Sequence, residues 1–211
     1  MAYRVVALVL AAGSSTRMGT SKQLLRLGNK AVIRHGVDTL TTAGIRDIVV
    51  VCGDEYEACA RELEGTGASI VRNEAKISDM ADSVRIGLQT LDEEIPYSGV
   101  IVALSDQPLV SEETCRTIIK FHRQMPDKII IPAFKGRRGH PSLFPAEVIS
   151  DIFFVPSMRD LIRAEGDRVL VVDLPDEGTV MDMDTEEDYR AVIARFAART
   201  HDAPAGENNV Q

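Results

Sequence analysis

The sequence feature that most constrains the fold is an apolar run that ends abruptly in very small residues. Residues 5–10 are rich in Val and Leu, which is typical of a parallel strand buried on both faces. The run is followed by Ala11, Ala12 and Gly13, whose side chains are so small that a ligand can approach the backbone closely. In open parallel sheets, ligands bind beyond the carboxyl ends of the strands. The run therefore predicts a buried strand with a binding loop directly after it.

The loop after this strand carries the groups that bind a polyphosphate. Gly13, Ser14 and Ser15 can turn several backbone N–H groups toward one point, and such a concavity suits an anion. Arg17 and Lys22 place two cations just beyond it. Each residue alone also fits an ordinary strand-to-loop turn with solvated basic side chains. Because all of these groups occur together, we interpret the loop as a phosphate-binding site.

Further along the chain, predicted strands and helices alternate, which indicates a three-layer, mostly parallel, Rossmann-like α/β sheet. Strands are expected at residues 48–52, 68–71, 100–104, 129–131 (ended by Pro132) and 180–183. Helices are expected at residues 31–43, 56–63 and 79–91, after Ser111 as N-cap, and from Asp184 or Thr185 onward. We expect residues 1–200 to form a single domain and residues 201–211 to form a disordered tail.

The composition argues against several classes of function. A net charge of -8 disfavours nonspecific binding to nucleic acid, which requires a basic surface. The three cysteines are widely spaced and suggest neither a disulfide framework nor a tight metal cluster, so a reducing cytoplasm fits best. We see no signal-peptide layout and no apolar stretch long enough to span a bilayer. We expect a cytoplasmic protein that binds neither nucleic acid nor membrane.

Two acidic residues are candidates for holding a magnesium ion. Asp106 comes just after the strand that ends at residue 104, and Pro108 stiffens the turn that follows. Asp184 precedes the last expected helix and faces the same side as Asp106 if both strand ends reach one cleft. Mg²⁺ takes one or two carboxylates plus substrate phosphates and water, so this pair is sufficient. A turn-capping role for Asp106 and a helix N-cap role for Asp184 are the structural alternatives.

Polar residues between the strand at 68–71 and the next helix are candidates for contacts with a base or a ribose. Asn73 follows the strand, and Ser78, Asp79 and Ser83 lie at the start of the helix. Their amide, hydroxyl and carboxylate groups can read a base edge or a ribose. A turn position for Asn73 and an N-cap role for Ser78 are the alternatives.

A turn rich in glycine and arginine supplies candidates for binding a second substrate. Gly139 lets the backbone pass close to a ligand, and His140 can pair with a phosphate or donate a hydrogen bond. A general-base role for His140 is less favoured because a phosphate monoester acceptor is already an anion near neutral pH. Arg159 follows the expected helix cap Ser157 and supplies another cation, with a solvated helix start as the alternative.

These motifs carry a family resemblance. The run from Leu10 to Gly19 and on to Lys22 resembles the signature loop of nucleotidyltransferases that join an NTP to a phosphorylated acceptor. Over nearly all of residues 5–192, the chain resembles the molybdopterin nucleotidyltransferase-like family, and most closely the molybdenum cofactor cytidylyltransferases. The residues that carry this resemblance are Ala11-Ala12-Gly13-Ser14-Ser15-Thr16-Arg17-Met18-Gly19, Asn73 with Ser83, Asp106-Gln107-Pro108, Gly139-His140-Pro141, Ser157-Met158-Arg159 and Asp182-Met183-Asp184-Thr185.

The resemblance implies a nucleotidyltransferase fold, Mg²⁺ dependence, and transfer of CMP from CTP to the phosphate of the molybdenum cofactor with release of pyrophosphate. It implies catalytic roles for Arg17 and Lys22, metal binding by Asp106 and Asp184, and a molybdoenzyme or chaperone as the recipient of the product. Ala12 looks like the cytidine version of the loop, because guanylyltransferase relatives carry a second glycine there. The expected nucleotide contacts are Leu10, Ala11, Ala12, Gly13, Ser14, Ser15, Asn73, Asp79 and Ser83, and the expected acceptor contacts are Gly139, His140 and Arg159.

One position departs from the family pattern, which usually has a glycine where Asp79 stands. Asp tolerates a positive φ, so the turn can survive, but a carboxylate there opposes the phosphates or alters the contacts to base and ribose. Two other interpretations stay open: a cytidylyltransferase for a sugar or isoprenoid phosphate, to whose Pro-Lys-Gln the run Ser21-Lys22-Gln23 has some likeness, and a non-catalytic nucleotide- or cofactor-binding protein that serves a molybdoenzyme. A redox role has little support because no flavin or nicotinamide motif is visible.

Overall fold

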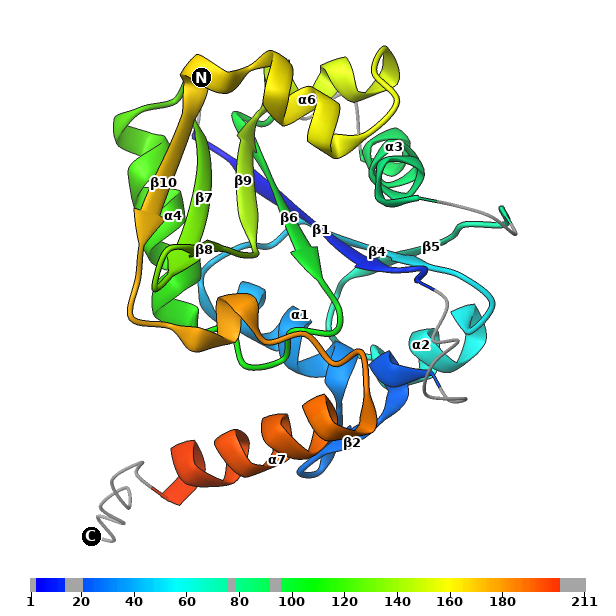
Figure 1. Cartoon of the computed structure of the whole chain (residues 1–211). Helices are drawn as coiled ribbons and strands as arrows, with labels where there is room; N and C mark the ends of the chain where they lie inside the picture. Colours follow the sequence, from blue (N-terminus) through cyan, green and yellow to red (C-terminus); the bar gives the residue numbers. More distant parts are fainter. Residues whose placement is uncertain (1–2, 14–20, 76–78, 92–95, 202–211) are drawn as a thin grey trace, which may run out of the picture.

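The computed structural model describes residues 3–13, 21–75, 79–91 and 96–201, and its centre is an eight-stranded, mostly parallel sheet (Figure 1). The strand order is β10-β7-β9-β6-β1-β4-β5, with β8 paired to β7, while β2 and β3 form a separate hairpin. The strands are β1 (Val5–Ala11), β2 (Arg26–Leu27), β3 (Lys30–Ala31), β4 (Ile48–Cys52), β5 (Ser69–Arg72), β6 (Gly99–Leu104), β7 (Ile129–Phe134), β8 (Arg137–Arg138), β9 (Ser142–Pro145) and β10 (Val169–Asp173).

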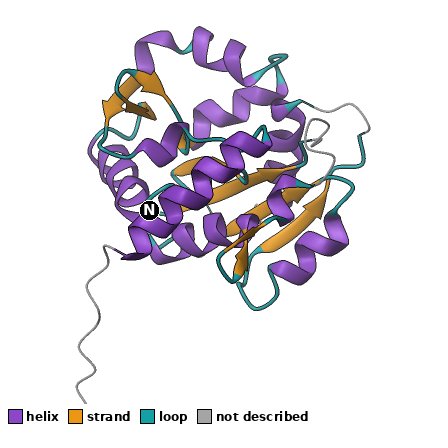
Figure 2. Cartoon of the chain, turned by 60° about the horizontal axis from the view of Figure 1, so that its bottom comes forward, coloured by secondary structure: helices purple, strands orange, loops and turns teal. Residues whose placement is uncertain are grey.

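Helices cover both faces of this sheet, as the view coloured by secondary structure shows (Figure 2). The α-helices are α1 (Val32–Thr42), α2 (Tyr56–Glu62), α3 (Met80–Thr90), α4 (Glu112–Gln124), α5 (Ala146–Ser150), α6 (Met158–Ala164) and α7 (Glu186–His201). Short 3-10 helices are η1 (Lys22–Leu24), η2 (Asp151–Phe153), η3 (Gly166–Arg168) and η4 (Glu177–Val180). Within the described residues, no helix is both long and apolar enough to cross a membrane.

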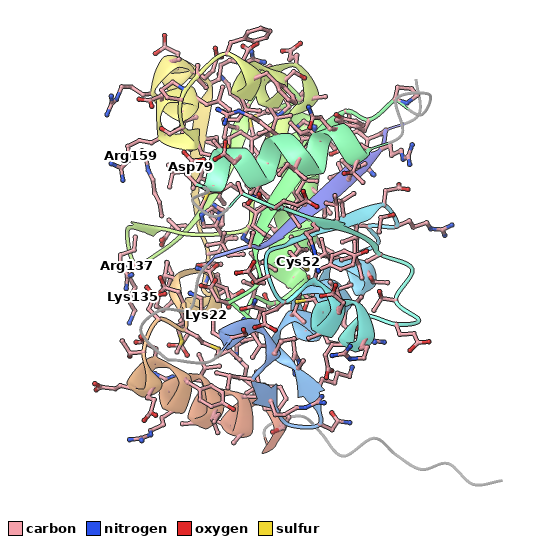
Figure 3. The ribbon with its side chains drawn as sticks, turned by 90° about the vertical axis from the view of Figure 1, so that its right-hand side faces the viewer. Lys22, Cys52, Asp79, Lys135, Arg137 and Arg159 are labelled. Carbon is pink, nitrogen blue, oxygen red and sulfur yellow. The ribbon has the colours of Figure 1, made fainter. Side chains whose placement is uncertain are left out.

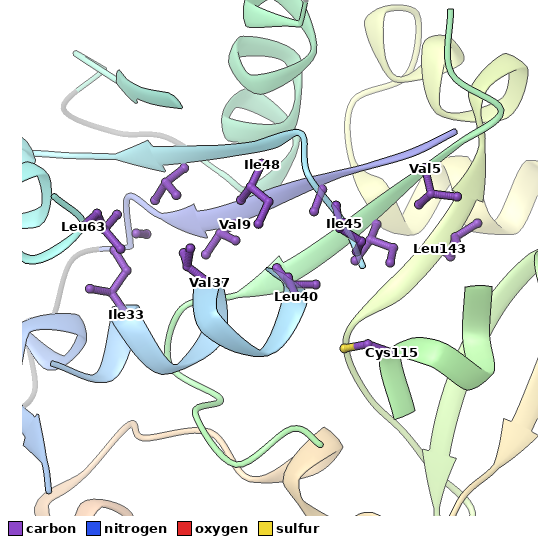
Figure 4. Close-up of a cluster of buried hydrophobic side chains, with 14 of the residues drawn as sticks. Val5, Val9, Ile33, Val37, Leu40, Ile45, Ile48, Leu63, Cys115 and Leu143 are labelled. Carbon is purple, nitrogen blue, oxygen red and sulfur yellow. The ribbon is translucent and has the colours of Figure 1, made fainter. Parts of the chain in front are cut away.

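Alternating residues of β1 divide the core into two layers, one on each face of the sheet. Val5 and Val9 pack with α1, α2 and α4, and Figure 4 shows this cluster around the apolar side of α1. Leu8 and Leu10 point the other way and pack with α3, α5 and α6. Because burial of each such side chain stabilises the fold by about 1.5–3 kcal/mol, the continuous apolar run commits β1 to the middle of the sheet. The three-layer α/β prediction is confirmed.

The chain order places a switch point beside β1. β1 pairs in parallel with β4 on one side and with β6 on the other, and the chain fills the β4–β5 side before it crosses to β6. The two crossovers therefore leave in opposite directions at the carboxyl ends of β1 and β6. A crevice at such a point is where open α/β sheets bind their ligands.

Local signals predicted most elements correctly. The strand at residues 48–52 is found as predicted, and the helix predicted at 31–43 runs over Val32–Thr42. The predicted caps are also present, because Ser111 and Ser157 each accept the N–H of the residue three positions later. These elements are specified by short-range patterns of apolar and capping residues.

The prediction that Pro132 ends its strand is wrong, because β7 continues to Phe134. Proline is disfavoured in a strand because it lacks an N–H donor. Here Pro132 uses its carbonyl oxygen, which accepts the N–H of Gly139 at 2.8 Å. The antiparallel strands β8 and β9, which follow this contact, were not predicted from the sequence.

The strand predicted at residues 180–183 is also wrong, since η4 ends at Val180 and the following residues form no regular element. Met183 is fully buried in a third cluster with Leu27, Val32 and Val192, beneath α7 and the β2–β3 hairpin. The apolar alternation therefore reflects the packing of a loop onto this small core. Helix α7 includes His201, the first residue of the predicted tail, and the remaining residues 202–211 lie outside the described part of the chain.

Candidate active site

A pocket of about 220 Å³ opens at the carboxyl ends of β1 and β6, where the switch point lies. It brings together the small residues after β1, the first turn of α3 and the acidic end of β6. Its lining residues are Leu10, Ala11, Ala12, Gly13, Lys22, Gln23, Asp79, Met80, Ser83, Leu104, Ser105 and Asp106. We call it the strand-end pocket.

The base of this pocket is fixed by backbone contacts from neighbouring elements. The carbonyl of Leu10 accepts the N–H of Ser105 at 3.1 Å, and that of Ala11 accepts the buried side-chain amide of Gln23 at 3.4 Å. A Cβ on Gly53, after β4, would lie 3.3 Å from the carbonyl oxygen of Ala12. These contacts hold the small residues after β1 so that they remain accessible from the pocket. The predicted Ser14, Ser15 and Arg17 lie outside the described residues.

Lys22, at the start of η1, joins the two predicted metal ligands. Its Nζ donates to Asp106 Oδ2 at 2.5 Å and to Asp184 Oδ1 at 2.8 Å. The side chains of Lys22 and Asp106 are 16% and 15% exposed, whereas that of Asp184 is 49% exposed. Burial lowers the pKa of Lys22, but its bonds to the two carboxylates outweigh this effect and raise the pKa above its ordinary value. Lys22 is therefore an ammonium cation held between two acids that are distant in the sequence.

The two carboxylates fit a divalent cation of the Mg²⁺ type. Mg²⁺ prefers hard oxygen ligands and is commonly bound by one or two carboxylates, with phosphate and water oxygens completing its shell. Asp106 and Asp184 supply such oxygens, and both reach one ammonium group. No group of three or more His, Cys, Asp or Glu side chains arranged for a metal occurs in the described residues. A metal here would thus depend on oxygens from a substrate.

The first turn of α3 forms another wall of the pocket. Asp79 is the N-cap of α3: its Oδ1 accepts the N–H of Asp82 at 2.9 Å, and its own N–H donates to Asp82 Oδ2 at 3.2 Å. The backbone at Asp79 is extended, with φ −97°, so tolerance of a positive φ is not needed there. Asp79 and Lys22 lie on the same side of the molecule and well separated along it (Figure 3). The alternative cap considered in the sequence, Ser78, lies outside the described residues.

Asn73 lies behind the pocket wall and is 4% exposed. Its Nδ2 donates to Ser83 Oγ at 3.3 Å, and its Oδ1 accepts the N–H of Ala75 at 3.0 Å. Ser83 lines the strand-end pocket, whereas Asn73 is not among the lining residues. The contacts of Asn73 therefore favour the turn interpretation, with the side chain positioning Ser83.

A larger pocket of about 470 Å³ lies next to the first one and shares Met80 with it. We call it the arginine pocket, because it contains two arginines above an apolar floor. Its lining residues are Met80, Val102, Ile131, Arg138, Gly139, His140, Ser142, Phe144, Met158, Arg159 and Ile162. The three predicted acceptor contacts are thus brought together, and α6 presents Arg159 on the same side as Asp79 (Figure 3).

The structure corrects the reason for glycine at position 139. A Cβ on Gly139 would lie 2.1 Å from the carbonyl oxygen of Thr179, which also accepts the N–H of His140 at 2.9 Å. The close approach that requires glycine is therefore made by the η4 backbone, although Gly139 also lines the arginine pocket.

The contact of His140 with a phosphate stays a prediction, and its surroundings favour a neutral ring that donates a hydrogen bond over a charged one. Burial lowers the pKa of His140, although a hydrogen bond with the Val102 backbone opposes this shift. The imidazole is then neutral near pH 7, and a neutral ring is not a counter-ion for phosphate. Its Nδ1 is buried and has no hydrogen-bond partner among the described residues. The cations that line this pocket are Arg138 and Arg159.

Several site residues were missed in the sequence. Gln23, Met80 and Ser105 line the strand-end pocket, and Arg138 lines the arginine pocket. Arg138 lies within the glycine- and arginine-rich turn, and the composition of that turn was the signal that could have identified it. Met80 and Ser105 directly neighbour predicted residues, but nothing in their local sequence distinguishes them from core or turn residues.

An open α/β sheet with this strand order, and a charged pocket at its switch point, defines a nucleotidyltransferase-like fold. Residues 7–176 match the model of the MobA-like NTP transferase domain, so the chain belongs to the family of MobA-like NTP transferase domains.

The chain is similar to a protein named as an oxidoreductase and to solved structures that share its fold. Nicotine blue oxidoreductase of Paenarthrobacter nicotinovorans is 29% identical over 88% of this chain and 95% of its own length. Rv0371c of Mycobacterium tuberculosis is 27% identical with a TM-score of 0.77, covering 92% of this chain and 99% of that one, and it has also been solved with manganese. A 4-diphosphocytidyl-2C-methyl-D-erythritol synthase of Anaerococcus prevotii has a TM-score of 0.75 over 92% of this chain and 99% of its own; at 19% identity it shows the shared fold alone.

Proposed function

We propose that the protein transfers CMP from CTP to the phosphate of a molybdopterin-type cofactor and releases pyrophosphate. The observation that carries this proposal is the position of Lys22 between Asp106 and Asp184 in a pocket that adjoins the arginine pocket. One pocket then has the groups that hold a nucleoside triphosphate, and the other has cations for a phosphorylated acceptor. We propose a cytoplasmic location, with which the three free cysteines agree.

In the proposed reaction, an oxygen of the acceptor phosphate attacks the α-phosphorus of CTP. A phosphoanhydride bond forms to the acceptor, the bond between the α- and β-phosphates breaks, and pyrophosphate carries away the electron pair. Asp106 and Asp184 would hold Mg²⁺, which when bound neutralises charge on phosphate oxygens. Lys22 supplies an ammonium beside them, and we assign a similar role to Arg17. Catalysis then consists of positioning and electrostatic stabilisation, and it requires no covalent enzyme intermediate.

The lining of the arginine pocket supports a ring-bearing acceptor. Its floor is formed by apolar side chains such as Ile131, Phe144 and Met158, which suit a flat heterocycle better than a polyhydroxylated sugar. Buried hydroxyl groups need hydrogen-bond partners, and this floor offers few. Product transfer to a molybdoenzyme or its chaperone would complete the proposed role.

The experiment is a transfer assay with labelled CTP, Mg²⁺ and a panel of phosphorylated acceptors. Lys22→Ala and Asp106→Ala should each lower the rate of CMP transfer by about 10²–10³, because each removes an electrostatic contact to the reacting phosphates. Lys128→Ala and Asp167→Ala are matched surface controls and should retain the wild-type rate, since both residues lie at the opposite, amino-terminal ends of β7 and β10. Near wild-type turnover in both site variants would reject the assignment.

Two other functions are separated by the same assay. Transfer to a sugar or isoprenoid phosphate, but not to the pterin cofactor, would make the protein a different cytidylyltransferase, the alternative to which the run Ser21-Lys22-Gln23 points. CTP binding without pyrophosphate release from any acceptor would favour a non-catalytic binding protein.

An oxidoreductase is the second candidate function, favoured by the match to nicotine blue oxidoreductase over 88% of this chain. Reduction of nicotine blue by the protein with an added electron donor tests it directly. If that activity were present and unchanged in Lys22→Ala, the redox function would replace the transferase proposal.

A further inference from the structure

We propose that Asp79 selects the base of the nucleotide, favouring a pyrimidine with an amino group at position 4 over one with a carbonyl group there. The inference rests on the proposed function, because it takes the strand-end pocket as a nucleotide site. Asp79 lines that pocket from the first turn of α3, whereas Lys22 and Asp106 line it elsewhere, at the ends of η1 and β6.

The charges on the pocket wall determine which end of the nucleotide lies near Lys22 and which lies near Asp79. A triphosphate is strongly anionic, so it is attracted to the ammonium of Lys22 and to a cation held by Asp106 and Asp184. The carboxylate of Asp79 repels the same phosphates from the α3 side of the pocket. The helix N-terminus would otherwise attract an anion, but its capping carboxylate opposes that attraction. The base is therefore left facing Asp79 and Ser83.

A carboxylate in this position distinguishes between pyrimidines because it only accepts hydrogen bonds. Cytosine presents an amino donor at N4, whereas thymine presents the O4 carbonyl as an acceptor, and uracil carries the same carbonyl. The amino group can donate to Asp79, while a carbonyl oxygen in the same place would meet the carboxylate oxygens with like partial charge. One hydrogen bond to a charged group typically changes affinity by about 10-fold or more.

The fixed geometry of Asp79 makes this contact selective. The backbone N–H of Asp82 donates to Asp79 Oδ1 at 2.9 Å and holds the carboxylate at the helix end, while the Asp82 side chain accepts the backbone N–H of Asp79 at 3.2 Å. A mobile surface carboxylate could rotate away from an unfavourable base at little cost. Asp79 could do so only by losing its hydrogen bond to the N–H of Asp82. Helix capping alone does not require the charge, because Ser and Asn are equally common N-cap residues.

The capping role provides matched variants that separate selection from folding. Asp79→Asn keeps an N-cap and adds an amide donor, Asp79→Ser keeps an N-cap without charge, and Asp82→Asn alters the other half of the capping box. Dissociation constants for CTP and UTP, measured by calorimetry on the full chain with Mg²⁺, give the ratio that matters. Thermal melting of each variant checks that the helix cap and the fold are retained.

We expect the wild-type protein to bind CTP about 10-fold or more tightly than UTP. Asp79→Asn should shift the ratio toward UTP, Asp79→Ser should bring it close to one, and Asp82→Asn should leave it unchanged. A wild-type ratio near one, or one unaffected by Asp79→Asn in a folded variant, overturns the inference while leaving the nucleotide site intact. If neither nucleotide binds the wild-type protein, both the proposed function and this inference fail.

Discussion

Replacing Asp176 with Asn should destabilise the fold by about 2–4 kcal/mol, because this carboxylate joins η4 to the start of α4 and to α7. Asp176 precedes η4 and is 6% exposed. Its Oδ2 accepts the N–H of Ser111 and the hydroxyl of Thr114, both at 2.8 Å, and so anchors the start of α4. Its Oδ1 accepts the N–H of Gly178 at 3.0 Å, and Arg199 of α7 lies 3.3 Å away.

The magnitude follows from these contacts. A hydrogen bond to a charged group contributes about 1.5–3 kcal/mol, and a buried donor left unpaired costs about 1–3 kcal/mol. Asn can replace one carboxylate oxygen with its carbonyl, but its amide nitrogen must face donors at the other oxygen. One or two charge-assisted bonds are then lost, together with the attraction to Arg199, which gives the stated range.

The pH dependence of this contribution has a definite sign. Burial raises the pKa of Asp176, but the N–H and hydroxyl donors of Ser111 and Thr114 outweigh burial and hold the pKa below its ordinary value. A carboxyl whose pKa is lower in the folded state stabilises the fold fully above the unfolded pKa of about 3.9. That stabilisation is lost as the pH falls through the folded-state pKa.

Urea unfolding of the wild-type, Asp176→Asn and Asp127→Asn proteins tests this reasoning at pH 7 and at about pH 3, below the ordinary Asp pKa of about 3.9. Asp127 is an exposed control whose ion pair with Lys128 spans 3.8 Å. The difference between wild type and Asp176→Asn should shrink at the lower pH, while Asp127→Asn should differ little from wild type. A difference below about 0.5 kcal/mol at pH 7, the range of ordinary surface substitutions, would refute the energetic role of this network.

Two further predictions concern the pockets. Lys22→Met should raise the affinity for Mn²⁺ about 10-fold in the absence of nucleotide, because the ammonium held by Asp106 and Asp184 opposes a second cation. Electron paramagnetic resonance measures this affinity, and an unchanged value would show that these acids are not the metal ligands. Gly139→Ala should lower stability by about 1–3 kcal/mol, measured by urea unfolding, because the new Cβ would lie 2.1 Å from the Thr179 carbonyl oxygen. A fully stable Gly139→Ala protein would contradict the rigid packing of η4 against this segment.

The fold was predictable from the sequence where local patterns decide the structure. The strand at residues 48–52 contains only apolar residues, and Ser111 is followed by an acidic first turn, so no distant contact is needed to specify either element. Where distant contacts decide, prediction failed. Pro132 lies within β7, where its carbonyl accepts the N–H of Gly139, and Met183 lies in an irregular segment that is buried beneath α7.

The same distinction applies to the candidate site. Asp106 and the residues after β1 stood out because they directly follow apolar runs, and their placement in one pocket follows from the sheet topology. Asn73 also follows a strand, yet it is buried behind Ser83. Its side-chain amide donates to the Ser83 hydroxyl and accepts the N–H of Ala75 in the turn. The contact between Lys22 and Asp184 joins residues 162 positions apart, and no local signal specifies it.

The two candidate metal ligands are held in place by different parts of the fold, and the third hydrophobic cluster holds one of them. Asp106 follows a central strand and is mostly buried, whereas Asp184 is half exposed in a segment between η4 and α7. The buried neighbour Met183 and the cap formed by Thr185 and Asp188 fix Asp184 in place. The third core, in which Met183 packs against the β2–β3 hairpin and α7, lies beside η1, which carries Lys22. Packing of this core therefore places the second carboxylate beside Lys22, whereas the contact of Lys22 with Asp106 is made at the end of β6.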